Sequence, residues 1–345
     1  MNCQYTTSEI DRAGDLLMQC PQDEGALLVL NYWRAFHARF LHDVVMPCNF
    51  IDCTNEREDF SVSTSARSKR AVSIIDKLRR FPRLKLSQIQ DIIGIRYVLT
   101  PTSLRASDRN WFTDFVEWQK EYLSNCFTIK RVSDYINCPR ETGYRAVHFV
   151  LEYRDLERQE FDCLQFELQI RTRYQHLWAM AVETVDMVYG KSLKTSKEND
   201  LEGWSNFFRC ASALISCRED MPVVGIYAQK DEAAIRDELL KLGQEKTFFT
   251  KLAAISQATK SQLLESYDYW FLEIDIRNHE SRVLGFKDDA LRNAIALYEA
   301  REQNPDCMRG DVNVVLVSAQ GFRDIREAYP SYFLDIEDFV SLIRS

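Results

Sequence analysis

The segment that decides the fold is Leu-Gln-Phe-Glu-Leu-Gln-Ile-Arg at residues 164–171, in which apolar and polar side chains alternate without interruption. Side chains two residues apart on a strand point to the same face of the sheet. The pattern therefore predicts a strand with one apolar and one polar face. The apolar set is Leu164, Phe166, Leu168 and Ile170, and the polar set is Gln165, Glu167, Gln169 and Arg171. Taken alone, this pattern favours an ordinary half-exposed strand whose polar face meets solvent.

A second strand is predicted at residues 91–99, Asp-Ile-Ile-Gly-Ile-Arg-Tyr-Val-Leu, which has an acid at its start and an arginine inside an apolar run. Charged groups are rarely buried without a partner, so Asp91 and Arg96 indicate that this strand has charged partners nearby and is not only part of an apolar core. Between the two strands, the Pro- and Gly-containing segment 134–148 leads into a third strand. Two carboxylates on adjacent sheet elements, Asp91 and Glu167, with cations nearby, suit a divalent metal and a phosphorylated substrate.

Three short motifs punctuate this region: Asp-Ile-Ile-Gly-Ile-Arg at 91–96, Gly-Tyr-Arg-Ala-Val-His at 143–148 and Glu-Leu-Gln-Ile-Arg-Thr at 167–172. In this order and at this spacing they resemble the signatures of the RelA/SpoT-type alarmone synthetase domain. The resemblance extends over about Ser61 to Glu183 and implies nothing direct about the rest of the chain. It implies an α/β (α+β) fold, a nucleotidyltransferase-like mixed β-sheet flanked by helices.

Residues 67–85 hold eight basic side chains and a single acid, Asp76. This local excess of positive charge suits a polyanion such as a nucleoside triphosphate, although a solvated face is the usual role of such a run. We expect a helix from Ser65 to Arg80, because apolar residues recur there at helical spacing. They are Ala71, Ile74, Ile75 and Leu78.

The resemblance implies transfer of pyrophosphate from ATP to the 3′-hydroxyl of GDP or GTP, which gives the alarmone (p)ppGpp. Asp91 and Glu167 are the expected ligands of Mg²⁺, and Glu167 is the residue expected to accept the hydroxyl proton. By resemblance, the ATP donor is held through its adenine by Arg67 and Arg96 and through its phosphates by Lys69, Lys77 and Arg80. Tyr144 is expected to stack on the acceptor base. His148, Gln169 and Arg171 are expected to line the same site; for His148, a purely structural strand histidine is an equal alternative.

The sequence does not decide which molecule accepts the pyrophosphate. Similar synthetases usually have Asn where this chain has His176, and an acid followed by His soon after the Trp, where this chain continues Ala-Met-Ala-Val-Glu-Thr at 179–184. The main alternative is therefore a toxic relative that pyrophosphorylates an adenosine nucleotide or the 3′ end of tRNA, in a toxin–antitoxin or phage-defence setting. A non-catalytic nucleotide sensor is the third interpretation.

A chain of 345 residues is long enough for two domains with sizeable cores. We expect an N-terminal helical segment at 1–60 that packs on the catalytic domain, a synthetase domain at 61–197 and a second, C-terminal helical/α+β domain at 198–345. The expected C-terminal elements are strands at 269–276, 282–286 and 312–317 and a helix at 288–302. Residues 201–345 carry 17 Lys and Arg against 24 Asp and Glu. This acidic part could be a packing or homo-dimerisation module, or it could have a regulatory, partner-binding role.

The remaining composition describes a cytoplasmic protein. We expect no membrane span and no signal peptide, because the chain has no uninterrupted apolar run near 18 residues and the N-terminus lacks a basic and an apolar region. The ten cysteines are scattered without a Cys-x-x-Cys pair, so a reducing compartment is expected and a zinc site is not.

Overall fold

The computed structural model describes residues 4–41, 60–101, 111–154, 161–189, 203–246, 248–249, 252, 267–275, 280–309, 311–318 and 336–345. A mixed sheet forms its centre, with strand order β3-β4-β5-β2-β1-β8-β6-β7. The strands are β1 (Phe60–Ser68), β2 (Ile93–Pro101), β3 (Thr128–Asp134), β4 (Val147–Glu152), β5 (Gln165–Thr172), β6 (Tyr269–Asp275), β7 (Glu280–Phe286) and β8 (Val312–Ser318).

The helices cover the sheet and continue beyond it. The α-helices are α1 (Thr7–Gln19), α2 (Glu24–Phe40), α3 (Ala71–Arg80), α4 (Trp111–Cys126), α5 (Arg173–Tyr189), α6 (Trp204–Arg218), α7 (Glu232–Glu245), α9 (Leu291–Glu302), α10 (Pro305–Arg309) and α12 (Glu337–Arg344). Short 3-10 turns are η4 (Leu86–Gln88), η7 (Gly225–Tyr227) and η8 (Asp288–Ala290). None of these helices is long and apolar enough to cross a membrane.

Strand β5 lies inside the sheet, parallel to β2 and antiparallel to β4. Its predicted apolar set is buried, since Phe166, Leu168 and Ile170 are 0% exposed. The sequence pattern thus correctly assigned the two faces of this strand. The predicted fold class, a mixed sheet flanked by helices with an additional C-terminal region, is confirmed.

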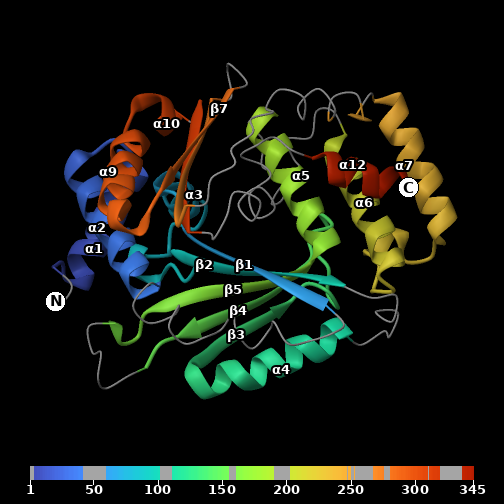
Figure 1. Cartoon of the computed structure of the whole chain (residues 1–345), viewed down its shortest axis with the longest axis horizontal. Helices are drawn as coiled ribbons and strands as arrows, with labels where there is room; N and C mark the ends of the chain where they lie inside the picture. Colours follow the sequence, from blue (N-terminus) through green and yellow to red (C-terminus); the bar gives the residue numbers. More distant parts are fainter. Residues whose placement is uncertain are drawn as a thin grey trace.

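Helices cover both faces of this sheet. Helix α4 lies on one face and α5 on the other (Figure 1). Under α4, the Phe115 ring meets those of Phe60 and Tyr97, and α2 joins the same core, where the Phe40 ring lies against Phe166. In the described residues, helix α2 thus packs against the sheet through the same apolar core as α4.

A second core lies between α5 and the C-terminal helices α6, α7 and α12. It contains Trp178, whose ring lies edge-on to Phe208 and whose indole N–H donates to the Phe208 carbonyl at 2.7 Å. Phe339 of α12 also packs against Phe208, with 5.9 Å between the ring centroids. Helix α5, which directly follows β5, is thus held by residues that are far away in the sequence.

The C-terminal strands extend the same sheet. Strand β8 pairs with β1 at Ala66 and Ser318, and β6 lies between β8 and β7. The predicted strands and the helix in this part are confirmed as β6, β7, β8 and α9. The predicted boundary near 197 lies outside the described residues, so the division of the chain into domains stays a prediction.

The expected helix from Ser65 to Arg80 is wrong in its first part. Residues Phe60–Ser68 form β1, which pairs residue for residue with Ile93–Pro101, and α3 begins only at Ala71. Sheet pairing decides this segment because strand formation depends on neighbours more than on local sequence. The apolar stripe itself was assigned correctly, since its four residues are buried on α3. Strand β3 was missed because it is largely exposed and shows no apolar alternation.

Candidate active site

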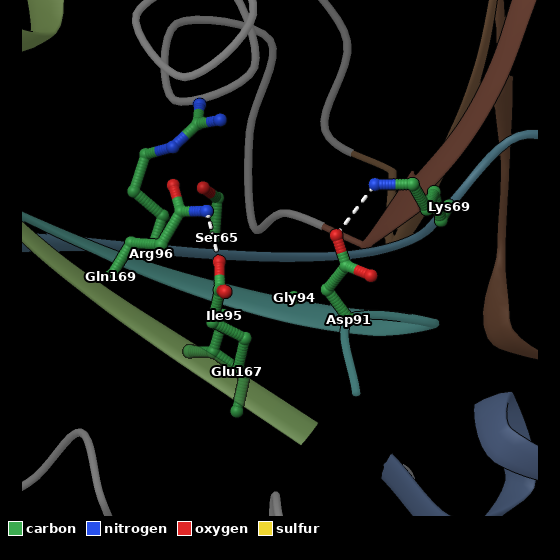
Figure 2. Close-up of a pocket in the computed structure, with 8 residues that line it drawn as sticks. All are labelled: Ser65, Lys69, Asp91, Gly94, Ile95, Arg96, Glu167 and Gln169. Atoms are coloured by element: carbon green, nitrogen blue, oxygen red, sulfur yellow. Dashed lines mark hydrogen bonds and ion pairs between the residues drawn. The ribbon is translucent and has the colours of Figure 1, made fainter. Parts of the chain in front are cut away.

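A cleft opens above the centre of the sheet. Figure 2 shows the eight residues that line it: Ser65, Lys69, Asp91, Gly94, Ile95, Arg96, Glu167 and Gln169. They come from β1, β2, β5 and the segments that flank α3 and β2. Gly94 lies opposite Glu167 in the strand register, and a Cβ added there would meet nothing within 4 Å. The floor of the cleft therefore has room for a ligand between the charged side chains.

Asp91 is held by two lysines. Lys69 Nζ lies 2.6 Å from Asp91 Oδ2, and Lys77 Nζ lies 2.7 Å from Oδ1. Burial by itself would raise the pKa of Asp91, but the two ammonium groups outweigh it and lower this pKa to about 2. Asp91 is therefore ionised at neutral pH, and one carboxylate neutralises part of the charge of two cations. The aspartate side chain keeps 20% exposure, which leaves it accessible from the cleft.

Five side chains on the polar face of β5 and beside it form a closed hydrogen-bonded ring: Glu167, Gln169, Arg171, Tyr144 and His148. Gln169 Nε2 donates to Glu167 Oε1 at 2.5 Å, and Arg171 Nη2 donates to Gln169 Oε1 at 2.7 Å and to the Tyr144 hydroxyl at 2.6 Å. His148 closes the ring, with Nε2 at 2.7 Å from the Tyr144 hydroxyl and Nδ1 at 3.4 Å from Glu167 Oε1. Each member therefore restricts the orientation of its neighbours.

Two members of this ring, Glu167 and Tyr144, have shifted pKa values. Burial raises the pKa of Glu167, but the hydrogen bond and charge of His148 and the Gln169 amide together lower it below its ordinary value. Burial raises the pKa of Tyr144, so its hydroxyl stays protonated. His148 turns Nε2 toward the Tyr144 hydroxyl and Nδ1 toward Glu167, so that an N–H at Nδ1 can donate to the Glu167 carboxylate. At neutral pH, Glu167 is thus an oriented, ionised carboxylate at the edge of the cleft.

The remaining predicted residues differ in how the structure places them. Arg96 lines the cleft and is 8% exposed. Arg67 lies on β1 opposite Gly94, but its side chain is outside the described part. Arg80 is exposed at the end of α3 and is not one of the residues that line the cleft. Sequence reasoning missed Ser65 as a cleft residue because it placed this residue on a helix; on β1 it lies opposite Arg96.

The carboxylates fit a magnesium ion. Mg²⁺ in phosphate-handling sites is usually held by one or two carboxylates, with substrate phosphates and water as the other ligands. Asp91 and Glu167 line one cleft and supply two carboxylates. Within the described residues, no group of three or more His, Cys, Asp or Glu side chains is arranged to hold a metal. Two carboxylates in one cleft suit a Mg²⁺ site whose other ligands are substrate phosphates and water.

Comparison with known proteins gives a family-level match. Residues 66–193 match the family model described as "Region found in RelA / SpoT proteins". The GTP pyrophosphokinase YjbM of Bacillus subtilis (strain 168) is 26% identical over 174 residues, which cover 49% of this chain and 74% of that protein. Among solved structures, small alarmone synthetase 1 of Bacillus subtilis bound to its product pppGpp is 24% identical, with a TM-score of 0.43 over 54% of this chain and 89% of that one. Small alarmone synthetase 2 of the same organism is 23% identical, with a TM-score of 0.40 over 53% and 91%.

The matched region contains the three motifs that carried the resemblance, at 91–96, 143–148 and 167–172. It also contains both carboxylates of the cleft and the five-residue ring. Residues 66–193 of this chain therefore form a RelA/SpoT-type domain.

Proposed function

We propose that this chain is a nucleotide pyrophosphokinase that transfers the β,γ-pyrophosphoryl group of ATP to the 3′-hydroxyl of GDP or GTP and so makes (p)ppGpp. The observation that carries the proposal is the joint placement, in one cleft, of an aspartate paired with two lysines and an oriented glutamate. The RelA/SpoT-type match and the name of the relative, a GTP pyrophosphokinase, support the same reaction class.

In the proposed reaction, the 3′-oxygen of the acceptor attacks the β-phosphorus of ATP. The bond from the β-phosphorus to the oxygen bridging the α- and β-phosphates breaks, and AMP leaves with its electron pair. The proton of the 3′-hydroxyl passes to Glu167, which is ionised and faces the cleft. Positioning and charge stabilisation carry most of the catalysis of phosphoryl-type transfers, so the arrangement of cations in the cleft is central.

On the donor side, Lys69 and Lys77 are the cations available to the triphosphate. In the structure both bind Asp91, and both stay partly exposed, with 24% and 28% of their side-chain surface accessible. A bound triphosphate offers these ammonium groups a stronger anion, so we propose that they turn from Asp91 to the phosphates. A Mg²⁺ ion held by Asp91 and Glu167 would neutralise phosphate charge during the transfer. Arg96, which lines the cleft, is proposed to contact the adenine together with Arg67.

On the acceptor side, the ring around Tyr144 is proposed to hold the base and ribose. The exposed Arg140 guanidinium lies 4.4 Å from the Tyr135 ring centroid and 5.6 Å from that of Tyr144. An acceptor base could take the place of this guanidinium on the aromatic face, since both stack on π-systems. His148 and Gln169 would then orient Glu167 toward the 3′-hydroxyl, and Arg171 would keep Gln169 in place.

The test is incubation of the purified chain with Mg²⁺ and radiolabelled ATP together with GDP, GTP, unlabelled ATP or bulk tRNA in separate reactions. We expect labelled guanosine products with GDP or GTP. Label on tRNA or on an adenosine nucleotide alone would favour the toxic relative with another acceptor. If ATP binds but no label is transferred to any of the four acceptors, the chain would be a non-catalytic nucleotide sensor. The Glu167→Gln variant is the matched control, since it keeps the shape of the side chain and removes its charge.

A further inference from the structure

A buried ion pair joins helix α2 to helix α9. Arg34 of α2 and Glu302, the last residue of α9, are 268 positions apart, yet Arg34 Nη1 lies 2.5 Å from Glu302 Oε2. Each side chain is only 5% exposed. Tyr298, one turn earlier on α9, donates to Glu302 Oε1 at 3.0 Å and accepts from Arg34 Nη2. Figure 1 shows α9 beside the N-terminal helices and α3.

The same pair contacts the backbone that leads into α3. Glu302 Oε1 accepts from the N–H of Ala71, the first residue of α3, at 2.9 Å. Helix starts leave such N–H groups without a partner inside the helix. The residue that precedes α3, Arg70, makes no side-chain capping bond. Glu302 therefore takes the role of the missing cap from a distant part of the sequence, where a negative charge also suits the helix dipole.

Arg34 contacts the neighbouring residue of this backbone. Its Nε donates to the carbonyl of Lys69 at 2.8 Å, and the Lys69 N–H donates to Ile92, next to Asp91, at 2.7 Å. The short segment from Lys69 to Ala71 is thus held by Arg34, by Glu302 and by Ile92, the residue before β2. Lys69 extends from this segment and Lys77 from the helix that follows it, and both reach Asp91.

We propose that Glu302, acting with Arg34, is a positioning residue for the two phosphate-binding lysines, so that the C-terminal region forms part of the donor site. This inference rests on the proposed function, because it takes Lys69 and Lys77 as the cations that bind the ATP phosphates. A buried ion pair is in general a weak source of stability compared with apolar packing of the same volume. The pair also forms hydrogen bonds to the backbone of Lys69 and Ala71. These bonds give it a second role, which is to hold Lys69 and Lys77 in position.

The structure offers a matched control on the same helix. Arg301, next to Glu302, pairs with Glu273 at 2.5 Å and with Asp306 at 2.9 Å, both within the C-terminal region. Arg301→Gln therefore weakens the C-terminal region without touching the segment before α3. Glu302→Gln keeps the size of the side chain but removes the charge that Arg34 and the Ala71 N–H face. If Glu302 only stabilised the C-terminal region, Glu302→Gln and Arg301→Gln should have similar effects on binding of the ATP analogue.

The experiment uses the full chain. Titration calorimetry measures the dissociation constant of a non-hydrolysable ATP analogue, steady-state kinetics measures the KM for donor and acceptor separately, and hydrogen exchange measures protection of the α3 amides. For Glu302→Gln we expect an analogue dissociation constant about tenfold higher, which is the size of a lost helix cap, and faster exchange in the first turn of α3. The acceptor KM should stay within about twofold of wild type, and Arg301→Gln should leave all three measurements within about twofold.

Equal effects of the two variants, or wild-type analogue affinity and α3 exchange in Glu302→Gln, would overturn the proposal. Should Glu302→Gln not fold, the double variant Arg34→Leu/Glu302→Leu leaves no unpaired buried charge. It should fold and still bind the analogue weakly; wild-type affinity in it would also overturn the proposal. Lack of analogue binding by the wild-type chain would instead refute the proposed function, and the exchange rates at α3 would still decide whether Glu302 holds this segment.

Discussion

Replacing Asp91 by Asn should affect stability and activity by amounts that the structure predicts. The pKa of Asp91 is lowered from its ordinary 3.8 to about 2, because two lysines outweigh the cost of burial. This difference corresponds to roughly 2 kcal/mol of folding free energy at neutral pH. Folding stabilises the ionised form of Asp91. Its contribution to the free energy of unfolding is therefore complete above about pH 4 and is lost as the pH falls toward 2. Asp91→Asn should therefore cost about 2 kcal/mol at pH 7, and this cost should shrink in acid.

Urea unfolding of wild type and Asp91→Asn at pH 7, and at the lowest pH where the wild type still folds, measures this difference. Asp76→Asn is the control, because Asp76 is an exposed acid on the same helix as Lys77; its effect should stay within about 0.5 kcal/mol. Turnover of Asp91→Asn should fall below about a tenth of wild type, a barrier increase of at least about 1.4 kcal/mol. Equal stability of Asp91→Asn and wild type at pH 7, or a difference that grows in acid, would refute the argument from the lysine pair.

Other predictions follow from the same site and from Glu219, a partly buried acid at the end of α6. Glu167→Gln should reduce transfer below about a tenth of wild type with little change in the thermal midpoint, as measured by single-turnover kinetics and calorimetry. Tyr144→Ala should raise the acceptor KM far more than the donor KM, whereas Lys77→Ala should do the reverse; equal donor losses in both would contradict the division of the cleft. Burial raises the pKa of Glu219 to about 7, so the folded state keeps a proton that the unfolded chain loses above about pH 4.5. Stability should therefore decline between about pH 4.5 and 7, and Glu219→Gln should gain about 1–2 kcal/mol over wild type at pH 8 but not at pH 4, in urea titrations.

The central strands were predictable because each carries its own signal. Period-two alternation identified β5 and its buried face, and an apolar run with two charges identified β2. The helical stripe of α3 was visible for the same reason. Strand β1 has no such local signal, and its conformation depends on pairing with β2 along its whole length. Exposed β3 likewise depends on its neighbour β4, a long-range contact that periodicity does not report.

The site was predictable in its residue types but not in its contacts. Motif spacing brought Asp91 and Glu167 to one sheet, and the structure places both at one cleft. Neither the closed ring around Tyr144 nor the lysine pair on Asp91 follows from spacing, because each depends on side chains from several elements. The contact between Glu302 and Ala71 spans 231 positions. An acid at the end of a helix gives no sequence signal that it caps another helix so far away.

The most direct test of the proposed chemistry is the identity of the nucleotide that leaves ATP. With Mg²⁺, GTP or GDP and ATP labelled in the base, the account predicts that labelled AMP forms in equal amount to the pyrophosphorylated guanosine product, because the bond between the α-phosphate oxygen and the β-phosphorus breaks. Release of labelled ADP in step with the product would mean transfer of a single phosphoryl group and would contradict the account.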